Sequence, residues 1–241
     1  MKEDHHRFIL EQIRKRAGKP TKHTFLDSYL GTSHVRYPIN NPEMRGIARE
    51  FMRTHAHLTA DEFSRILTSL IKGESGTEKM MAGFLLDYSR TDQRKFKPKL
   101  FDDWLSHLEG WAEIDTLCTG LYARKEVPAQ WQTWEDLIRR FSKSKDIGKR
   151  RASLVLLCAP VRYVEIAEMA DMAFENITRL SHEREVLITK AISWLLRSMI
   201  KHYRKEVLAF VNAHAETLPA IALRETRTKL STGVKGKRKS A

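Results

Sequence analysis

The sequence predicts an all-α fold, and three observations support that class. Glycine and proline are scarce, with Gly 11 and Pro 7 in 241 residues. Apolar residues recur at helical spacing, and no segment alternates apolar and polar residues as a half-buried strand does. No Asn-Gly or Asp-Gly pair marks a tight hairpin. With 41% hydrophobic and 30% charged residues, the chain has the composition of a folded protein.

The first helices are predicted from apolar spacing and from their end signals. Phe8, Ile9 and Ile13 lie on one side of the first helix, and Pro42 suits the first turn of the third. Thr59 and Glu62 form a capping-box pattern before the fourth. The expected ranges in this part of the chain are 3–16, 24–30, 42–54, 60–71 and 77–88.

The remaining helices follow at short intervals, and the same apolar periodicity predicts them. Their ranges are 98–107, 111–123, 131–142, 146–158, 161–180, 182–200, 202–213 and 218–230. Helix pairs that recur every 30 to 45 residues, roughly, are typical of helical repeats. The prediction is a right-handed solenoid of about six degenerate helix pairs with a concave basic face. An irregular helical bundle is the alternative.

The cysteine count and the chain start exclude several classes of protein. Cys118 and Cys158 are too few for a disulfide framework or a multi-cysteine zinc site. The first residues lack the apolar run of a secretory signal, and no segment is long enough to cross a bilayer. We therefore expect a cytoplasmic protein. The triplet Asp4-His5-His6 lies in a terminal helix, and we expect no metal there and no cofactor.

The positive charge indicates a polyanionic partner. The formal net charge is +13, and the last eleven residues hold four of the cations and no acid, which leaves +9 on the rest. Nucleic acid is the commonest partner of so basic a chain, and a well-solvated basic surface is the alternative. The expected organisation is one domain over residues 1–230, followed by a disordered basic tail over 231–241.

One candidate site lies in the helix predicted over 111–123. Trp111, Asp115 and Tyr122 are spaced to lie along one edge of that helix, beside its apolar face. A carboxylate between two aromatic rings is partly desolvated, which raises its pKa unless a cation lies opposite. An aspartate that pairs with a neighbouring helix is the structural alternative.

A second candidate site lies in the helix predicted over 182–200. Its buried face is expected to contain Ile188, Ile192, Leu195 and Met199. Trp194 points away from that face, and three cations share its side: Lys190, Arg197 and Lys201. Either a phosphate-bearing ligand or a neighbouring helix would cover this ring.

A third basic feature is Lys149-Arg150-Arg151, at the start of an apolar helix. Arginine at a helix N-terminus opposes the helix dipole, so it gains little from its own helix. Its fork of N–H donors is better placed there if an anion binds nearby. A solvated arginine is the alternative.

Together these motifs resemble the DNA alkylation repair glycosylases of the HEAT-like repeat family (the AlkD type). The order is Trp111-x-x-x-Asp115, then Arg151-Ala152, then the run from Lys190 to Arg197. Pro42-x-x-Arg45 resembles an early helix of that family, and Arg224-Glu225 its closing segment. The resemblance covers residues 29–229.

The resemblance implies a role for each matching residue. Asp115 matches the catalytic aspartate, Trp111 and Trp194 the two tryptophans that face the sugar, and Arg151 a phosphate-contacting arginine. Lys149, Arg150, Lys190, Arg197 and Lys201 are the further expected DNA contacts. Two positions depart from the family pattern, since Ala112 stands where an aspartate is common and Ser193 where a glycine is frequent.

The implied function is hydrolysis of the N-glycosidic bond of cationic alkylated purines, such as 3-methyladenine and 7-methylguanine, in duplex DNA. We expect a monomer without an obligate protein partner, and the resemblance implies excision without a deep base-flipping pocket. Two alternatives stay open. One is a helical-repeat module that binds DNA or RNA without cutting, which the change at Ala112 keeps open. The other is a protein–protein scaffold.

Overall fold

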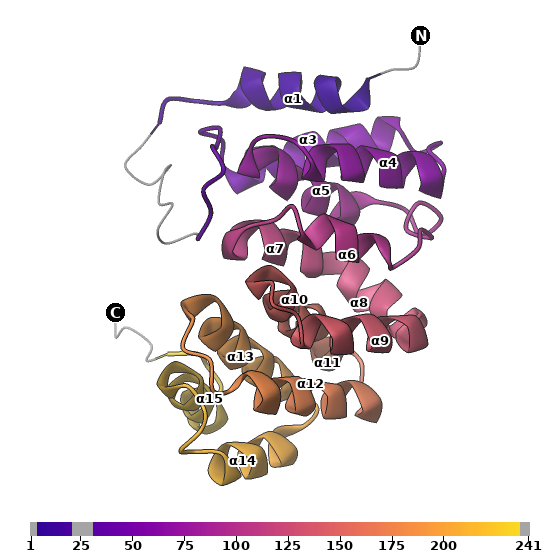
Figure 1. Cartoon of the computed structure of the whole chain (residues 1–241). Helices are drawn as coiled ribbons and strands as arrows, with labels where there is room; N and C mark the ends of the chain where they lie inside the picture. Colours follow the sequence, from indigo (N-terminus) through magenta and orange to yellow (C-terminus); the bar gives the residue numbers. More distant parts are fainter. Residues whose placement is uncertain (1–3, 21–30, 237–241) are drawn as a thin grey trace. The chain divides into compact units, whose positions relative to one another are not determined.

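The computed structural model describes residues 4–20 and 31–236, and within these ranges the secondary structure is entirely helical (Figure 1). No residue in the described ranges belongs to a β-strand. The all-α prediction is therefore confirmed. The helix expected over 24–30, like the tail residues Lys237, Arg238 and Lys239, lies outside the described residues.

The chain divides into two compact units, Met1–Tyr122 and Ala123–Ala241. Each unit is described by itself below. The single repeat domain over residues 1–230, the solenoid and its basic concave face stay predictions.

The first unit is built around a buried central helix. Its helices are α1 (His5–Arg16), α3 (Asn41–Thr54), α4 (Ala60–Ile71), α5 (Gly76–Tyr88), α6 (Leu100–Leu105), α7 (Gly110–Cys118) and the start of α8 (Gly120–Ala129). α5 packs against α3, α4 and α7, and each of its residues from Gly76 to Leu86 is buried. From Met80 to Leu86 every residue of α5 is apolar, as expected of a helix that is covered on all sides, so α5 forms the core of this unit.

Three helices of the first unit begin with complete capping boxes. The pairs are Asn40 with Glu43, Thr59 with Glu62, and Ser75 with Glu78. In each pair the first side chain accepts a backbone N–H of the first turn, and the glutamate accepts the N–H of the capping residue. The predicted box at Thr59 and Glu62 is confirmed.

The second unit has two long helices at its centre. Its helices are the rest of α8, from Ala123, then α9 (Trp131–Ser142), α10 (Ile147–Cys158), α11 (Pro160–Tyr163), α12 (Ala167–Leu180), α13 (Val186–Met199), α14 (Arg204–Ala213) and α15 (Ala220–Thr232). α10 packs against α9, α12 and α13, and α13 packs against α15. The predicted buried face of α13 is confirmed, because Ile188, Ile192, Leu195 and Met199 are fully inaccessible to solvent.

Two predicted helices are interrupted. The helix expected over 111–123 ends at Cys118, because Thr119 is extended and Gly120 adopts φ +76°. A Cβ on Gly120 would lie 1.8 Å from Oδ1 of Asp87, so this turn requires glycine. The helix expected over 161–180 is likewise broken at Val164, which is extended, and resumes at Ala167. No helix of the described residues is long and apolar enough to cross a membrane.

Candidate active site

α7 places Trp111 and Asp115 one turn apart on one side of the first unit. The helix starts at Gly110, which adopts φ +65°, and both side chains are half-buried. Residues four apart on a helix lie close together on its surface. The predicted adjacency of this tryptophan and this carboxylate along one helix edge is therefore confirmed.

The opposite side of α7 is fixed by Glu113, whose side chain is 1% exposed. One of its carboxylate oxygens accepts the Thr32 hydroxyl at 2.9 Å, and the other accepts the Glu109 N–H at 2.9 Å. Nδ1 of His34 lies 3.0 Å from the first oxygen. These bonds tie α7 to the segment that precedes α3. Because residues two apart on a helix point in nearly opposite directions, the bonds leave Asp115 on the other face.

A close helix crossing also positions α7. A Cβ on Gly83 of α5 would lie 2.3 Å from the backbone oxygen of Thr116. Only a glycine allows the two helix backbones to approach this closely.

Lys79 is a buried cation on α5, and burial lowers its pKa, while the carboxylate of Glu113 acts in the opposite direction. The ammonium of Lys79 donates to the carbonyls of Ile71 and Gly73, both at 2.8 Å.

Tyr122 does not share a helix with Asp115, contrary to the prediction. It lies on α8, beyond the break at Gly120, and is fully buried. Its ring stacks with Phe96 and Phe101, with centroids 5.3 Å apart in both pairs. The proposed placement of Asp115 between two aromatic residues of one helix is therefore wrong, and Tyr122 is a core residue.

In the second unit, the basic run at the start of α10 makes contacts within the protein. Arg151 is buried, and its guanidinium donates to the carbonyl of Leu187 at the start of α13. Arg150 forms a two-pronged ion pair with Glu183, with donor–acceptor distances of 2.7 and 3.1 Å. Lys149 is half-buried. These contacts join α10 to the segment that leads into α13.

α13 presents Trp194 beside a second polar network. Trp194, Lys190 and Arg197 are half-buried, while Lys201 is exposed beyond the end of the helix. The hydroxyl of Ser193 donates to Glu225 at 2.6 Å, and the guanidinium of Arg197 lies 3.4 Å from that carboxylate. Burial lowers the pKa of Arg197, and Glu225 opposes that shift.

The predicted site residues thus fall into two groups. Trp111 and Asp115 belong to the first unit, while Arg151, Trp194 and the five further cations belong to the second. Sequence reasoning missed Glu113, and it did not connect Ser193 with Glu225. Glu113 bonds to Thr32, 81 positions away, and Ser193 to Glu225, 32 positions away, and contacts this distant in sequence leave no signal in local spacing.

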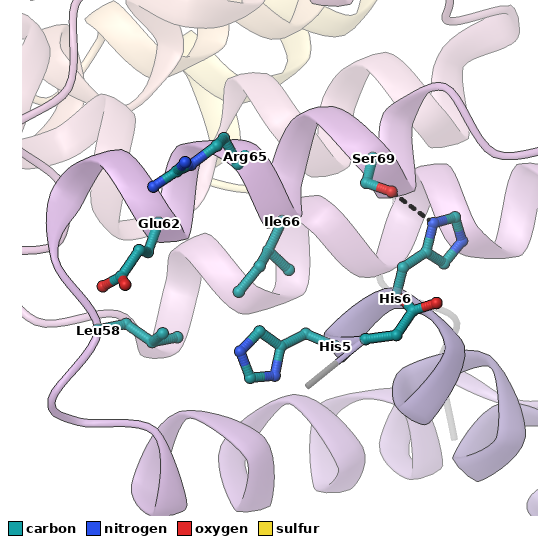
Figure 2. Close-up of a pocket in the computed structure, with 8 residues that line it drawn as sticks. His5, His6, Leu58, Glu62, Arg65, Ile66 and Ser69 are labelled. Carbon is teal, nitrogen blue, oxygen red and sulfur yellow. Dashed lines mark hydrogen bonds between the residues drawn. The ribbon is translucent and has the colours of Figure 1, made fainter. Parts of the chain in front are cut away.

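A cavity of about 290 Å³ lies in the first unit between α1 and α4 (Figure 2). His5 and His6 face Ile66 and Ser69 across it, and Nδ1 of His6 lies 2.7 Å from the Ser69 hydroxyl. Asp4 caps α1 by accepting the N–H of Arg7. No group of three or more His, Cys, Asp or Glu side chains in the described ranges could hold a metal ion.

Comparisons with known proteins give the following matches. The sequence profile of the family described as "DNA alkylation repair enzyme" matches residues 10–230. The structure is similar to that of a "Predicted DNA alkylation repair enzyme from Enterococcus faecalis", with a TM-score of 0.70 and 16% sequence identity. That match covers 86% of this chain and 93% of the other. No curated protein matches the sequence. At 16% identity the structural likeness shows the fold.

Proposed function

The chain belongs to the DNA alkylation repair enzyme family, and from that membership we propose that it is a DNA glycosylase. Its proposed substrates are cationic alkylated purines in duplex DNA, such as 3-methyladenine and 7-methylguanine. The observation that carries the proposal is the pair Trp111 and Asp115, half-buried and one turn apart on α7. Excision proceeds without a deep pocket for the base, and the enzyme acts as a monomer.

The chemistry of the lesion explains why one carboxylate suffices. Alkylation of a ring nitrogen gives the purine a positive charge, so the base leaves as a neutral molecule when the bond from C1′ breaks. No general acid is then needed, in contrast to glycoside hydrolases with two carboxylates. Asp115 stabilises the positive charge that develops on the sugar and orients the water whose oxygen bonds to C1′.

The other residues act on the sugar and the phosphates. The faces of Trp111 and Trp194 stabilise the developing sugar cation by roughly 0.5–2 kcal/mol each. By resemblance to the family, Arg151 is assigned a phosphate contact, and in this structure its guanidinium donates to the carbonyl of Leu187. The proposed backbone contacts, which add salt-dependent affinity, come from Lys149, Arg150, Lys190, Arg197 and Lys201.

Base release from methylated duplex DNA tests the proposal. Asp115→Asn removes the charge at nearly constant volume, so we expect the single-turnover rate to fall by about 10²–10³-fold. The matched control is Asp136→Asn, which removes an exposed carboxylate from α9 and should release base at the wild-type rate. Release of 7-methylguanine by Asp115→Asn at the wild-type rate would contradict the catalytic role. Tight duplex binding by wild-type protein without release of any base would favour a non-catalytic binding module.

A further inference from the structure

Tyr163 is a large aromatic residue left half-exposed at the end of a very short helix. α11 contains only Pro160–Tyr163, and its Val161 is fully buried. Val164 then continues the chain in an extended conformation. As a result the ring of Tyr163 stands at the surface of the second unit, 47% exposed.

Three cations from separate parts of the second unit surround this ring. The guanidinium carbon of Arg124, on α8, lies 4.3 Å from the ring centroid. The guanidinium carbon of Arg162 lies at 5.7 Å, and Nζ of Lys201, beyond α13, at 5.9 Å. All three distances are within the range of cation–π attraction. We call Tyr163, Arg124, Arg162 and Lys201 the Tyr163 cluster.

The three cations of the Tyr163 cluster differ from several arginines of this unit that pair with carboxylates. Arg139, Arg150 and Arg197 each pair with a glutamate. In the part of the chain that the structure describes, no carboxylate forms an ion pair with Arg124, Arg162 or Lys201, and all three side chains are exposed. The nearby carboxylate of Glu165 faces His202 instead, with its Oε2 3.7 Å from Nδ1 of that histidine.

The positive field extends beyond the ring. Nζ of Lys229 donates to the carbonyl of Arg197 at 2.7 Å. Its pKa is lowered, first by burial and then by the charges of Arg162 and Arg197. Like charges gathered in this way repel one another, and an anion bound between them would relieve that repulsion.

We propose that the Tyr163 cluster is a binding site for backbone phosphates of DNA, which adds Tyr163, Arg124 and Arg162 to Lys201, already assigned above as a backbone contact. A guanidinium that stacks on an aromatic ring keeps its N–H edge free to bind phosphate oxygens in a forked geometry. Tyr163 therefore acts as a platform that orients Arg124. Because Arg124 lies over the ring, the occupant is the phosphate backbone and not a stacked base. The identity of the anion as DNA rests on the proposed function.

The test is the affinity of the full-length protein for undamaged duplex DNA, measured by fluorescence anisotropy at several salt concentrations. A plot of log K against log salt has a negative slope, and each phosphate contact that is lost reduces its magnitude by about 0.9. We expect that change for Arg124→Ala and Lys201→Ala, with affinities reduced roughly 3–10-fold at moderate salt. Tyr163→Leu should weaken binding as well, whereas Tyr163→Phe, which keeps the aromatic face, should bind as wild type. Arg65→Ala on α4 removes an exposed arginine elsewhere and should change neither quantity.

Thermal melting of each variant separates a lost contact from a lost fold. Wild-type affinity and slope in Arg124→Ala, Lys201→Ala and Tyr163→Leu would overturn the proposal. So would variants that lose binding to an acidic polypeptide, with polyglutamate as the probe, while duplex binding is unchanged. If wild-type protein releases no base but these variants still lose duplex affinity, the proposed function fails and the phosphate site stands. If Asp115→Asn is inactive and the variants bind normally, only the phosphate site fails.

Discussion

At the scale of single residues, two carboxylates on α7 have opposite environments although only one residue separates them. Glu113 is buried and accepts bonds from Thr32 and from the backbone of Glu109. Asp115 lies on the other side of the helix and is half-buried. The bonds to Glu113 hold the helix in place, while Asp115, on the other face, is the carboxylate proposed to meet the substrate.

Replacing Glu113 by glutamine should therefore destabilise the fold. The amide NH₂ group would face donors that now bind a carboxylate oxygen, and such a mismatch in a buried site costs about 1–3 kcal/mol. Thermal unfolding of Glu113→Gln should show the melting temperature lowered by about 2–4 °C per kcal/mol. The matched control is Glu50→Gln, because Glu50 is 61% exposed and pairs with Arg16 at 2.9 Å on the surface. Equal melting temperatures for the two variants would rule out this anchoring role.

Local spacing predicts which residues share a helix face, and it does so well for Trp111 with Asp115 and for the buried face of α13. It does not reveal partners that are distant in sequence. Arg150 was expected to bind phosphate, and in the structure it pairs with Glu183, 33 positions away. Similarly, Ser193, which departs from the family pattern, donates a hydrogen bond to Glu225 that local spacing does not predict.

At the scale of whole elements, helix existence was more predictable than helix ends. The sequence of α7 continues into Gly120 without proline, so apolar periodicity alone predicted one helix through Ala123. The break depends on tertiary contacts, since Asp87 of α5 accepts the Leu121 N–H at 3.0 Å and pairs with Arg45 at 3.2 Å. An N-terminus fixed by a side chain from another helix has no local signature in sequence.

The close crossing of α5 and α7 predicts that Gly83 does not tolerate a larger side chain, whereas Gly46, a glycine inside α3, does. Gly83→Ala places a Cβ against the Thr116 backbone and should destabilise the fold by about 1–3 kcal/mol. It should also displace α7 and slow base release. Gly46→Ala on α3 is the control, because its Cβ would lie 3.6 Å from the nearest atom, on the side chain of Arg16. This substitution should stabilise the protein by about 0.5–1 kcal/mol. Chemical denaturation measures both, and a stability gain for Gly83→Ala would contradict the proposed close crossing.

At the scale of the whole molecule, the net charge of +13 divides into contributions with different surroundings. Some cations are engaged in ion pairs within the fold, as Arg139 is with Glu135 and Glu175. Others surround Tyr163 without a carboxylate in ion-pair range, among the residues that the structure describes. Composition alone predicted an anionic partner, but the division between paired and unpaired cations requires the fold.

The basic tail is the third contribution, and its role can be separated from catalysis. Residues 234–241 hold Lys235, Lys237, Arg238 and Lys239, so truncation after Gly233 removes four cations. The cut leaves α15 intact, because Gly233 is its C-cap with φ +75° and donates its N–H to the carbonyl of Lys229. The cut removes Lys235, whose Nζ lies 3.5 Å from Glu225, but Ser193 still donates to that carboxylate.

The truncated protein should bind duplex DNA more weakly at low salt. The magnitude of the negative slope of log K against log salt should decrease by about 0.9 for each tail cation that contacts a phosphate. Single-turnover base release at saturating protein should stay close to wild type, since none of the removed residues is proposed to touch the sugar or the base. A variant with the four cations replaced by glutamine, at full length, should reproduce the truncation if charge alone is responsible. A large loss of base release in either variant would assign the tail a part in excision and would refute the separation of affinity from chemistry.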